Sequence, residues 1–76
     1  MNNLKVVFNS PSEILDFVNT VEKYPYAMDL KKGRIIVDAK SVLGIMSIGL
    51  KNQIELKVYE ENCDDLRKEI SKFVAA

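Results

Sequence analysis

The sequence contains no histidine and only one cysteine, Cys63. Without an imidazole ring, the chain cannot carry a phosphoryl group on histidine and cannot perform Cys–His nucleophilic catalysis. We therefore expect Cys63 to be a passive thiol. A lone cysteine also forms no internal disulfide, which fits a reducing compartment and favours a cytoplasmic protein.

Long apolar runs and an excess of one charge are also missing. No segment approaches the roughly 18 apolar residues of a membrane-spanning helix, and no signal-peptide core follows the first residues. The 11 basic and 11 acidic side chains cancel, and no basic run exceeds two residues. We therefore expect neither membrane insertion nor nucleic-acid binding.

No metal or cofactor is predicted. Acidic side chains cluster in one loop, but this loop lacks the alternating ligand spacing and the glycine of a calcium site; its members are Glu60, Glu61, Asp64 and Asp65. A solvated loop that starts a helix explains them better. No glycine-rich loop that would cradle phosphate is present.

The sequence that remains is typical of one compact domain over residues 1–76. Apolar residues make up 47% of the chain and charged residues 29%. Residues 4–8 predict a strand. Ser10 is a predicted helix N-cap, with Pro11 in the first turn and Glu13 completing a capping box. Apolar residues at helical spacing continue the helix until Pro25, which disfavours helix at the preceding position.

The remaining elements are short and closely spaced. Residues 26–30 and 34–39 predict an antiparallel hairpin around a turn at residues 31–33. A short helix begins after Ser41 and is closed by Gly49 in the left-handed conformation. An alternating strand covers residues 53–59, and a last helix covers residues 64–74. The order βαββαβα predicts an α+β open-faced sandwich, with a four-stranded antiparallel sheet and three helices on one face.

The segment from Asp38 to Leu50, which reads DAKSVLGIMSIGL, resembles the signature of HPr, the phosphocarrier protein of the bacterial sugar phosphotransferase system. The element order matches that fold over the whole chain, and residues 18–24 are similar to the family's first helix. The resemblance implies a relay. HPr accepts phosphate on a histidine from the phosphoenolpyruvate-dependent Enzyme I and passes it to sugar permeases.

The chain departs from this family at the site of the chemistry. An ungapped alignment through the first helix places Ser10 at the histidine position and Ser12 at the position of the family's arginine. A serine hydroxyl without an adjacent base is a poor nucleophile, and its phosphate ester is a poor phosphoryl donor. We therefore expect a non-catalytic protein in which Ser10 is a helix cap. Residues 33–41 also look one residue longer than in typical HPr proteins, which leaves the hairpin register and the placement of Lys40 open.

Two other parts of the resemblance persist. Ser41 matches the serine that a dedicated kinase phosphorylates in HPr of Gram-positive bacteria, whose product joins a carbon-catabolite repressor; alternatively, Ser41 only caps the short helix. That helix is apolar nearly all round, and we expect Ile45 and Ile48 to face the core. We predict that three residues are partly exposed: Val42, Leu43 and Met46. Together with Lys40, they are predicted to bind a partner. Alternatively, all five apolar residues are core, or the patch pairs two copies.

The sequence therefore predicts an HPr relative without the phosphorylatable histidine and with a regulatory or protein-binding role. Its expected partners are a phosphotransferase-system component, a kinase or a transcription regulator, and the expected state is a monomer or weak homodimer. Two alternatives are a phosphocarrier, by family similarity, and a structural self-associating domain.

Overall fold

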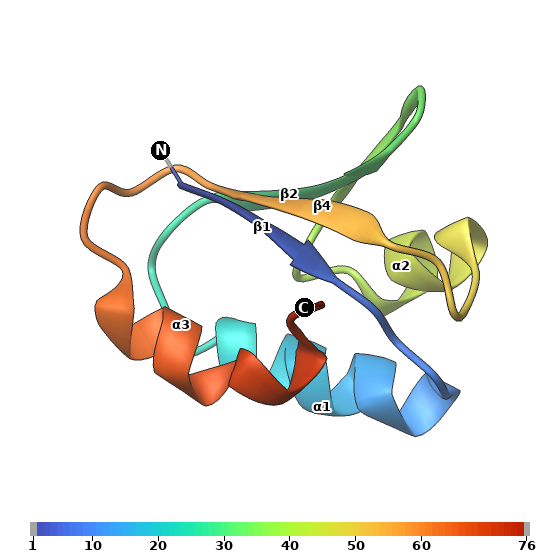
Figure 1. The fold of residues 1–76 in the computed structure, drawn as a ribbon, viewed down its shortest axis with the longest axis horizontal. Helices are drawn as coiled ribbons and strands as arrows, with labels where there is room; N and C mark the ends of the chain where they lie inside the picture. Colours follow the sequence, from blue (N-terminus) through green and yellow to red (C-terminus); the bar gives the residue numbers. More distant parts are fainter. Residues whose placement is uncertain (1, 76) are drawn as a thin grey trace.

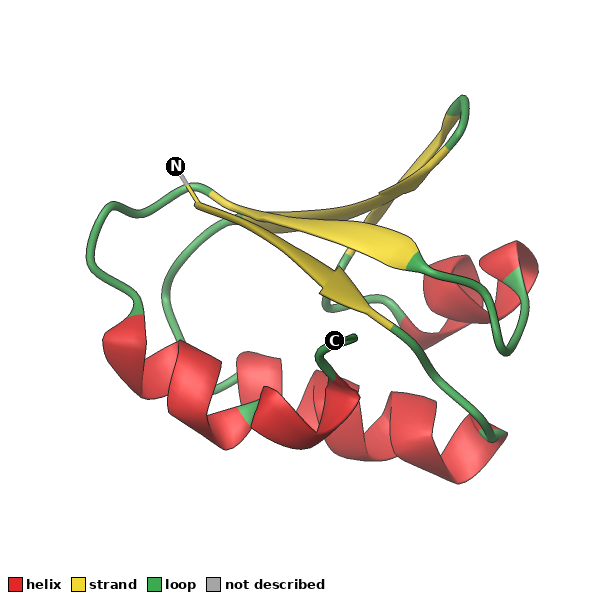
Figure 2. Ribbon diagram, viewed as in Figure 1, coloured by secondary structure: helices red, strands yellow, loops and turns green. Residues whose placement is uncertain are grey.

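The computed structural model describes residues 2–75 and consists of one sheet and a layer of helices (Figure 2). In chain order, its elements are β1 (Asn2–Val6), α1 (Pro11–Val21), β2 (Met28–Lys32), β3 (Ile35–Asp38), α2 (Val42–Ile48), β4 (Ile54–Val58) and α3 (Asp64–Glu69), followed by the 3₁₀ turn η1 (Ser71–Phe73). The sheet order is β1-β4-β2-β3, and all neighbouring strands are antiparallel. The helices cover one face of the sheet (Figure 1). The predicted fold class is confirmed.

The strand β4 is one of the two inner strands of the sheet, and its residues alternate between the two faces. Ile54, Leu56 and Val58 are buried, whereas the residues between them point toward the uncovered face. β4 pairs with β1 on one side, from Asn2 opposite Val58 to Val6 opposite Ile54, and with β2 on the other. The predicted alternation is confirmed, over five residues rather than seven.

β1 begins and ends earlier than predicted. The expected range was residues 4–8, but the strand ends at Val6. Beyond it, the chain turns toward its own C-terminal segment: the Val7 N–H donates to the Phe73 carbonyl at 2.9 Å, and Val6 forms an isolated bridge with Val74. Phe8 is buried all the same, outside any strand.

The hairpin of β2 and β3 turns at Gly33 and Arg34, so the predicted turn at residues 31–33 is wrong. Lys32 pairs with Ile35, which leaves a two-residue loop, and the pairing continues without a bulge to Asp29 opposite Asp38. Gly33 has a φ of 59°, and Arg34 has no positive φ. A glycine at the first position followed by such a residue is the pattern of a type II′ turn, whose twist suits a hairpin.

Two predicted helices end early. α1 ends at Val21 and is followed by tightened i→i−3 turns at Lys23 and Tyr24. α3 ends at Glu69 rather than Val74, because the chain tightens into η1 before Val74 reaches β1. The apolar stripes of both helices are buried as expected, with the exception of Val74, which is half-buried.

Three phenylalanines bind the helices to the sheet. The Phe8 and Phe17 rings are 4.9 Å apart between centroids, and the Phe73 ring lies 5.7 Å and 5.6 Å from them. Edge-to-face contacts at such distances add to the burial of apolar area. The rest of the core comes from β1, α1, β2, α2, β4, α3 and the segments beside them: Val6, Ile14, Val18, Val21, Met28, Leu30, Ala39, Ile45, Ile48, Ile54, Leu56, Val58, Cys63, Leu66 and Ile70.

Candidate functional site

The segment that begins α1 is organised as a helix cap. The Glu13 N–H donates to the Ser10 Oγ at 3.3 Å, and the backbone at Ser10 is extended, as an N-cap requires. The Ser10 and Ser12 hydroxyl oxygens are 3.1 Å apart. The Glu13 carboxylate accepts from the Asn9 N–H at 3.2 Å rather than from Ser10, so the predicted capping box closes one residue earlier.

Nothing in this cap activates Ser10 as a nucleophile. In the part of the chain that the structure describes, the hydrogen bonds of the Ser10 hydroxyl go to a backbone N–H and to the hydroxyl of Ser12, neither of which is a base. Serine needs a neighbouring general base to attack phosphorus at neutral pH. The geometry at Ser10 is that of a cap.

α2 is set by a serine at its start and a glycine inside it. The Ser41 Oγ accepts from the Gly44 N–H at 3.1 Å, which confirms Ser41 as the N-cap. A Cβ at Gly44 would lie 3.0 Å from the Val37 Cβ, so glycine lets α2 pack closely on β3. At the other end, Gly49 has a φ of 99° and a ψ of 173°. The positive φ suits glycine, but the conformation is not the left-handed helical one that was predicted.

The apolar residues of α2 divide as the sequence predicted. Ile45 and Ile48 are buried, and Val42 is half-buried. Leu43 is 83% exposed and Met46 is 42% exposed. We call Val42, Leu43 and Met46 the α2 patch. The alternative that all five residues are core is therefore wrong.

The end of α2 lies beside the segment that leads into Ser10. The Lys51 N–H donates to the Phe8 carbonyl at 2.7 Å, and α1 packs on α2. Leu50, which sequence reasoning did not single out, is 37% exposed in this linking loop. The serines matched to the family's chemical positions and the α2 patch therefore belong to neighbouring elements (Figure 1).

Lys40 has a contact of its own. Its ammonium donates to the Tyr24 carbonyl at 2.7 Å, which ties the start of α2 to the chain just after α1. This placement resolves the uncertainty that the hairpin register left open. The Lys40 ammonium is engaged within the chain and is not directed at Ser41, beside which the sequence placed it.

Near Lys40, Tyr24 is also joined to the last helix. Its hydroxyl donates to the Glu69 carboxylate at 2.6 Å, and the Lys23 ammonium lies 3.4 Å from the same carboxylate. The hydrogen bond to Glu69, supported by desolvation and by the charge of that carboxylate, raises the pKa of Tyr24 to about 12. The same hydrogen bond lowers the pKa of Glu69, assisted by the charge of Lys23. No sequence pattern predicts this hydrogen bond between residues 45 positions apart.

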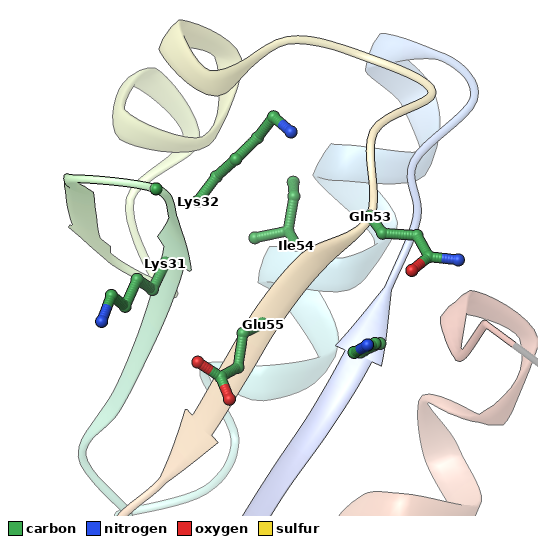
Figure 3. Close-up of a pocket in the computed structure, with 7 residues that line it drawn as sticks. Lys31, Lys32, Gln53, Ile54 and Glu55 are labelled. Carbon is green, nitrogen blue, oxygen red and sulfur yellow. The ribbon is translucent and has the colours of Figure 1, made fainter.

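An open hollow of about 360 Å³ lies near the hairpin end of the sheet, lined by Lys5, Lys31, Lys32, Gly33, Gln53, Ile54 and Glu55. Figure 3 shows Lys31 and Lys32 leaving β2 in opposite directions, as successive residues of a strand must. Glu55 pairs in register with both Lys5 and Lys31. The lysines therefore do not converge on one position where an anion would sit.

The described residues bring together no group of three or more cysteine and acidic side chains suited to a metal ion. Cys63 is buried at the start of α3, where its thiol makes no capping hydrogen bond. Over residues 2–75, no helix has the length and apolar character required to cross a bilayer.

The fold and the patch define a class: a small open-faced α+β sandwich that presents an apolar helix to the surface. A family model described as "PTS HPr component phosphorylation site" matches residues 14–76. The chain therefore belongs to the HPr family of the phosphotransferase system. The matched segment contains Ser41 and the α2 patch and begins after Ser10 and Ser12.

Three solved structures share the fold. HPr-C-His from Thermoanaerobacter tengcongensis is 25% identical with a TM-score of 0.74, covering 95% of this chain and 89% of its own. The phosphocarrier protein HPr from Bacillus anthracis is 18% identical with a TM-score of 0.72, covering 97% and 96%. The histidine-containing phosphocarrier protein of a mycoplasma is 11% identical with a TM-score of 0.69, covering 93% and 89%. A search of curated proteins finds no match.

Proposed function

We propose that this chain is a regulatory, protein-binding member of the HPr family that does not relay phosphate through histidine. It acts in the cytoplasm as a single domain over residues 1–76, as a monomer or weak homodimer. Its partner is a phosphotransferase-system component, a kinase or a transcription regulator, and this partner binds the α2 patch. The observation that carries the proposal is the 83% exposure of Leu43 in a chain without histidine.

The α2 patch has the character of a small docking surface. α2 packs through the buried Ile45 and Ile48 and the half-buried Val42, so the exposed Leu43 contributes little to the fold. Exposed apolar side chains such as these favour association once a partner removes them from water. The positions also match those that dock partners in the resembling family.

A pull-down with matched variants tests the docking surface. Enzyme I, the HPr serine kinase and the catabolite regulator are each offered to the immobilised chain. We expect the double variant Leu43→Ser, Met46→Ser to lose binding by at least about tenfold, since two apolar anchors are removed. The control, Ile35→Ser with Ile36→Ser, removes two other exposed apolar residues and should bind as the parent does.

Far-UV circular dichroism should be the same for the parent and both variants. Equal binding by the Leu43, Met46 variant and the parent would exclude the α2 patch as the docking surface. Failure of all three proteins to bind the parent would contradict the protein-binding role itself.

We further propose that phosphorylation of Ser41 regulates this binding. The Ser41 hydroxyl accepts from the N–H of Gly44, so a phosphate on it would meet the backbone N–H groups of the first turn of α2. The Lys40 ammonium makes no direct contact with the Ser41 hydroxyl, because it donates to the Tyr24 carbonyl at 2.7 Å. The phosphate would also lie next to the α2 patch, where it adds negative charge to an apolar surface.

The phosphorylation test uses the HPr serine kinase with ATP and a measured mass. We expect the parent to gain one phosphate and Ser41→Ala to gain none. Ser47→Ala is the matched control in the same helix, because the Ser47 hydroxyl only donates to the Gly44 carbonyl at 2.6 Å. An unmodified parent, or a phosphate that persists in Ser41→Ala, would contradict the assignment.

The phosphocarrier alternative is favoured by the matching family's description, which names a phosphorylation site. It requires label to pass from Enzyme I to this chain, and Ser10 would have to accept it without a base. The remaining alternative, a structural self-associating domain, predicts a tight dimer that hides Leu43 and Met46. Analytical ultracentrifugation of the parent and the Leu43, Met46 variant separates this alternative from the docking role.

A further inference from the structure

The two edges of the sheet are treated differently. The outer edge of β1 is covered by the C-terminal segment: the Val7 N–H donates to the Phe73 carbonyl at 2.9 Å, and the Ala75 N–H donates to the Lys5 carbonyl at 2.8 Å. β3 is the opposite edge, and within residues 2–75 no segment pairs with its outer side. Figure 1 shows its hairpin projecting away from the layer formed by α1 and α3.

β3 is also an unusually apolar edge. Ile35 is 47% exposed and Ile36 is 61% exposed, on opposite faces of the strand. Exposed edge strands usually carry charges, prolines or bulges that prevent pairing with another chain. Here the pairing with β2 is regular, so no bulge twists the edge away.

The register of the hairpin determines which backbone groups point outward. The Ala39 N–H donates to the Met28 carbonyl at 3.0 Å, so this pair exchanges hydrogen bonds between β2 and β3. In an antiparallel ladder every second pair does so, and the next such pair is Val37 with Leu30. The N–H and C=O groups of Ile36, and the N–H of Asp38, therefore face the open edge.

We propose that β3 pairs with β3 of a second copy of this chain, in an antiparallel register centred on Ile36. Ile36 then exchanges both of its backbone hydrogen bonds with Ile36 of the second copy. The same register sets Arg34 opposite Asp38 of the second copy, and the two-fold axis repeats this opposite-charge pair. The two four-stranded sheets become one continuous sheet.

Charge complementarity favours a second copy over another occupant. The Asp38 carboxylate accepts from the Lys40 N–H through one oxygen at 2.9 Å, and its other oxygen remains available to Arg34 of the second copy. The Asp38 carbonyl already accepts from the Ser41 N–H at 3.0 Å and has a second lone pair. The chain has a net charge of zero, so two copies do not repel at long range.

The association should be weak, because a four-residue strand buries little area. We expect a dissociation constant of roughly 10 µM to 1 mM, measured by sedimentation equilibrium of the full chain. Amide exchange should slow with rising concentration at Ile36 and Asp38. It should not change at Ile35 and Val37, whose N–H groups already face β2.

Variants test the register. Ile36→Lys brings two like charges to the two-fold axis and should raise the dissociation constant at least about tenfold. Leu43→Lys makes the same kind of change on the α2 patch and should leave the dissociation constant of self-association unchanged. Arg34→Asp and Asp38→Arg should each weaken self-association, and mixing the two should restore a heterodimer, because both charge pairs are then opposite again.

Three outcomes would overturn the proposal. One is that the chain is still monomeric at a concentration of about 2 mM. A monomer would also be expected if β3 instead pairs with an extended segment of another protein. Another is a dimer that Leu43→Lys abolishes and Ile36→Lys does not. The third is protection that rises equally at Ile35 and Ile36. Asp38→Arg also removes the hydrogen bond to Lys40, but the Ile36 and Arg34 variants change exposed side chains and keep the test decisive if that variant unfolds.

Discussion

Replacing Ser10 by alanine tests whether this residue is a helix cap or a phosphoryl acceptor. The N-cap bond is the Glu13 N–H to the Ser10 Oγ, and at 3.3 Å it is long. Loss of such a cap typically costs about 0.5–2 kcal/mol, and the length of this bond suggests the lower part, about 0.5–1 kcal/mol.

That cost converts into a measurable shift of the melting temperature. A chain of 76 residues unfolds with an entropy of roughly 0.16 kcal/mol/K near its midpoint, at about 2.1 cal/mol/K per residue. Ser10→Ala should therefore lower the Tm by about 3–6 °C. Ser10→Asp should keep the Tm of the parent, because aspartate caps as well as serine and its charge suits the positive end of α1.

Thermal unfolding followed by circular dichroism measures these shifts. Ser12→Ala is the control, since the Ser12 hydroxyl bonds only to the Ser10 hydroxyl on the exposed side of the cap, and its Tm should change by less than about 3 °C. An unchanged Tm in Ser10→Ala would refute the cap. A fall of more than about 12 °C would show that Ser10 does more than cap α1.

Two further predictions follow from contacts that fix the helices. The pKa of Tyr24 is raised to about 12 from 10.0 and the pKa of Glu69 is lowered, so their hydrogen bond should stabilise the fold between these two pKa values. The free energy of unfolding should fall as the pH rises from 10 toward 12, and it should fall again as the pH drops below the ordinary glutamate range through the lowered Glu69 pKa. Denaturant titrations at several pH values measure both changes, and Tyr24→Phe should flatten them. Gly44→Ala should destabilise the fold by about 1–3 kcal/mol, although alanine favours helix, because the new Cβ would lie 3.0 Å from the Val37 Cβ. Urea unfolding measures this change, and a variant more stable than the parent would contradict the close packing of α2 on β3.

The parts of the fold that could be predicted are those that depend on residues close together in the sequence. Ser10 with Pro11 fixes the start of α1, and Ser41 fixes the start of α2. The alternation of Ile54, Leu56 and Val58 identifies a half-buried strand without further information. The same holds for the division of α2, because a helix that lies on a sheet buries one stripe.

The errors arose where distant segments decide. α3 ends early because Val74 bridges Val6, a pairing that no local periodicity encodes. The turn falls at Gly33 and Arg34 rather than at residues 31–33, because the pairing of β2 with β3 selects one register.

The candidate site shows the same limit. The exposure of Leu43 and the caps at Ser10 and Ser41 were predictable from spacing. The bond from Lys40 to the Tyr24 carbonyl was not, because it joins residues that are 16 positions apart and separated by the hairpin of β2 and β3. The hairpin contributes to this placement, since Lys40 follows directly after its regular pairing with β2 ends.

The most direct measurement of the central claim is incubation with Enzyme I, labelled phosphoenolpyruvate and a permease subunit, with HPr from Bacillus anthracis as the positive control. We predict that the control carries label to the permease, while this chain stays unlabelled and delivers none, because it has no imidazole to accept and release the phosphoryl group. Label that reaches the permease through this chain, from whatever side chain, would contradict the account.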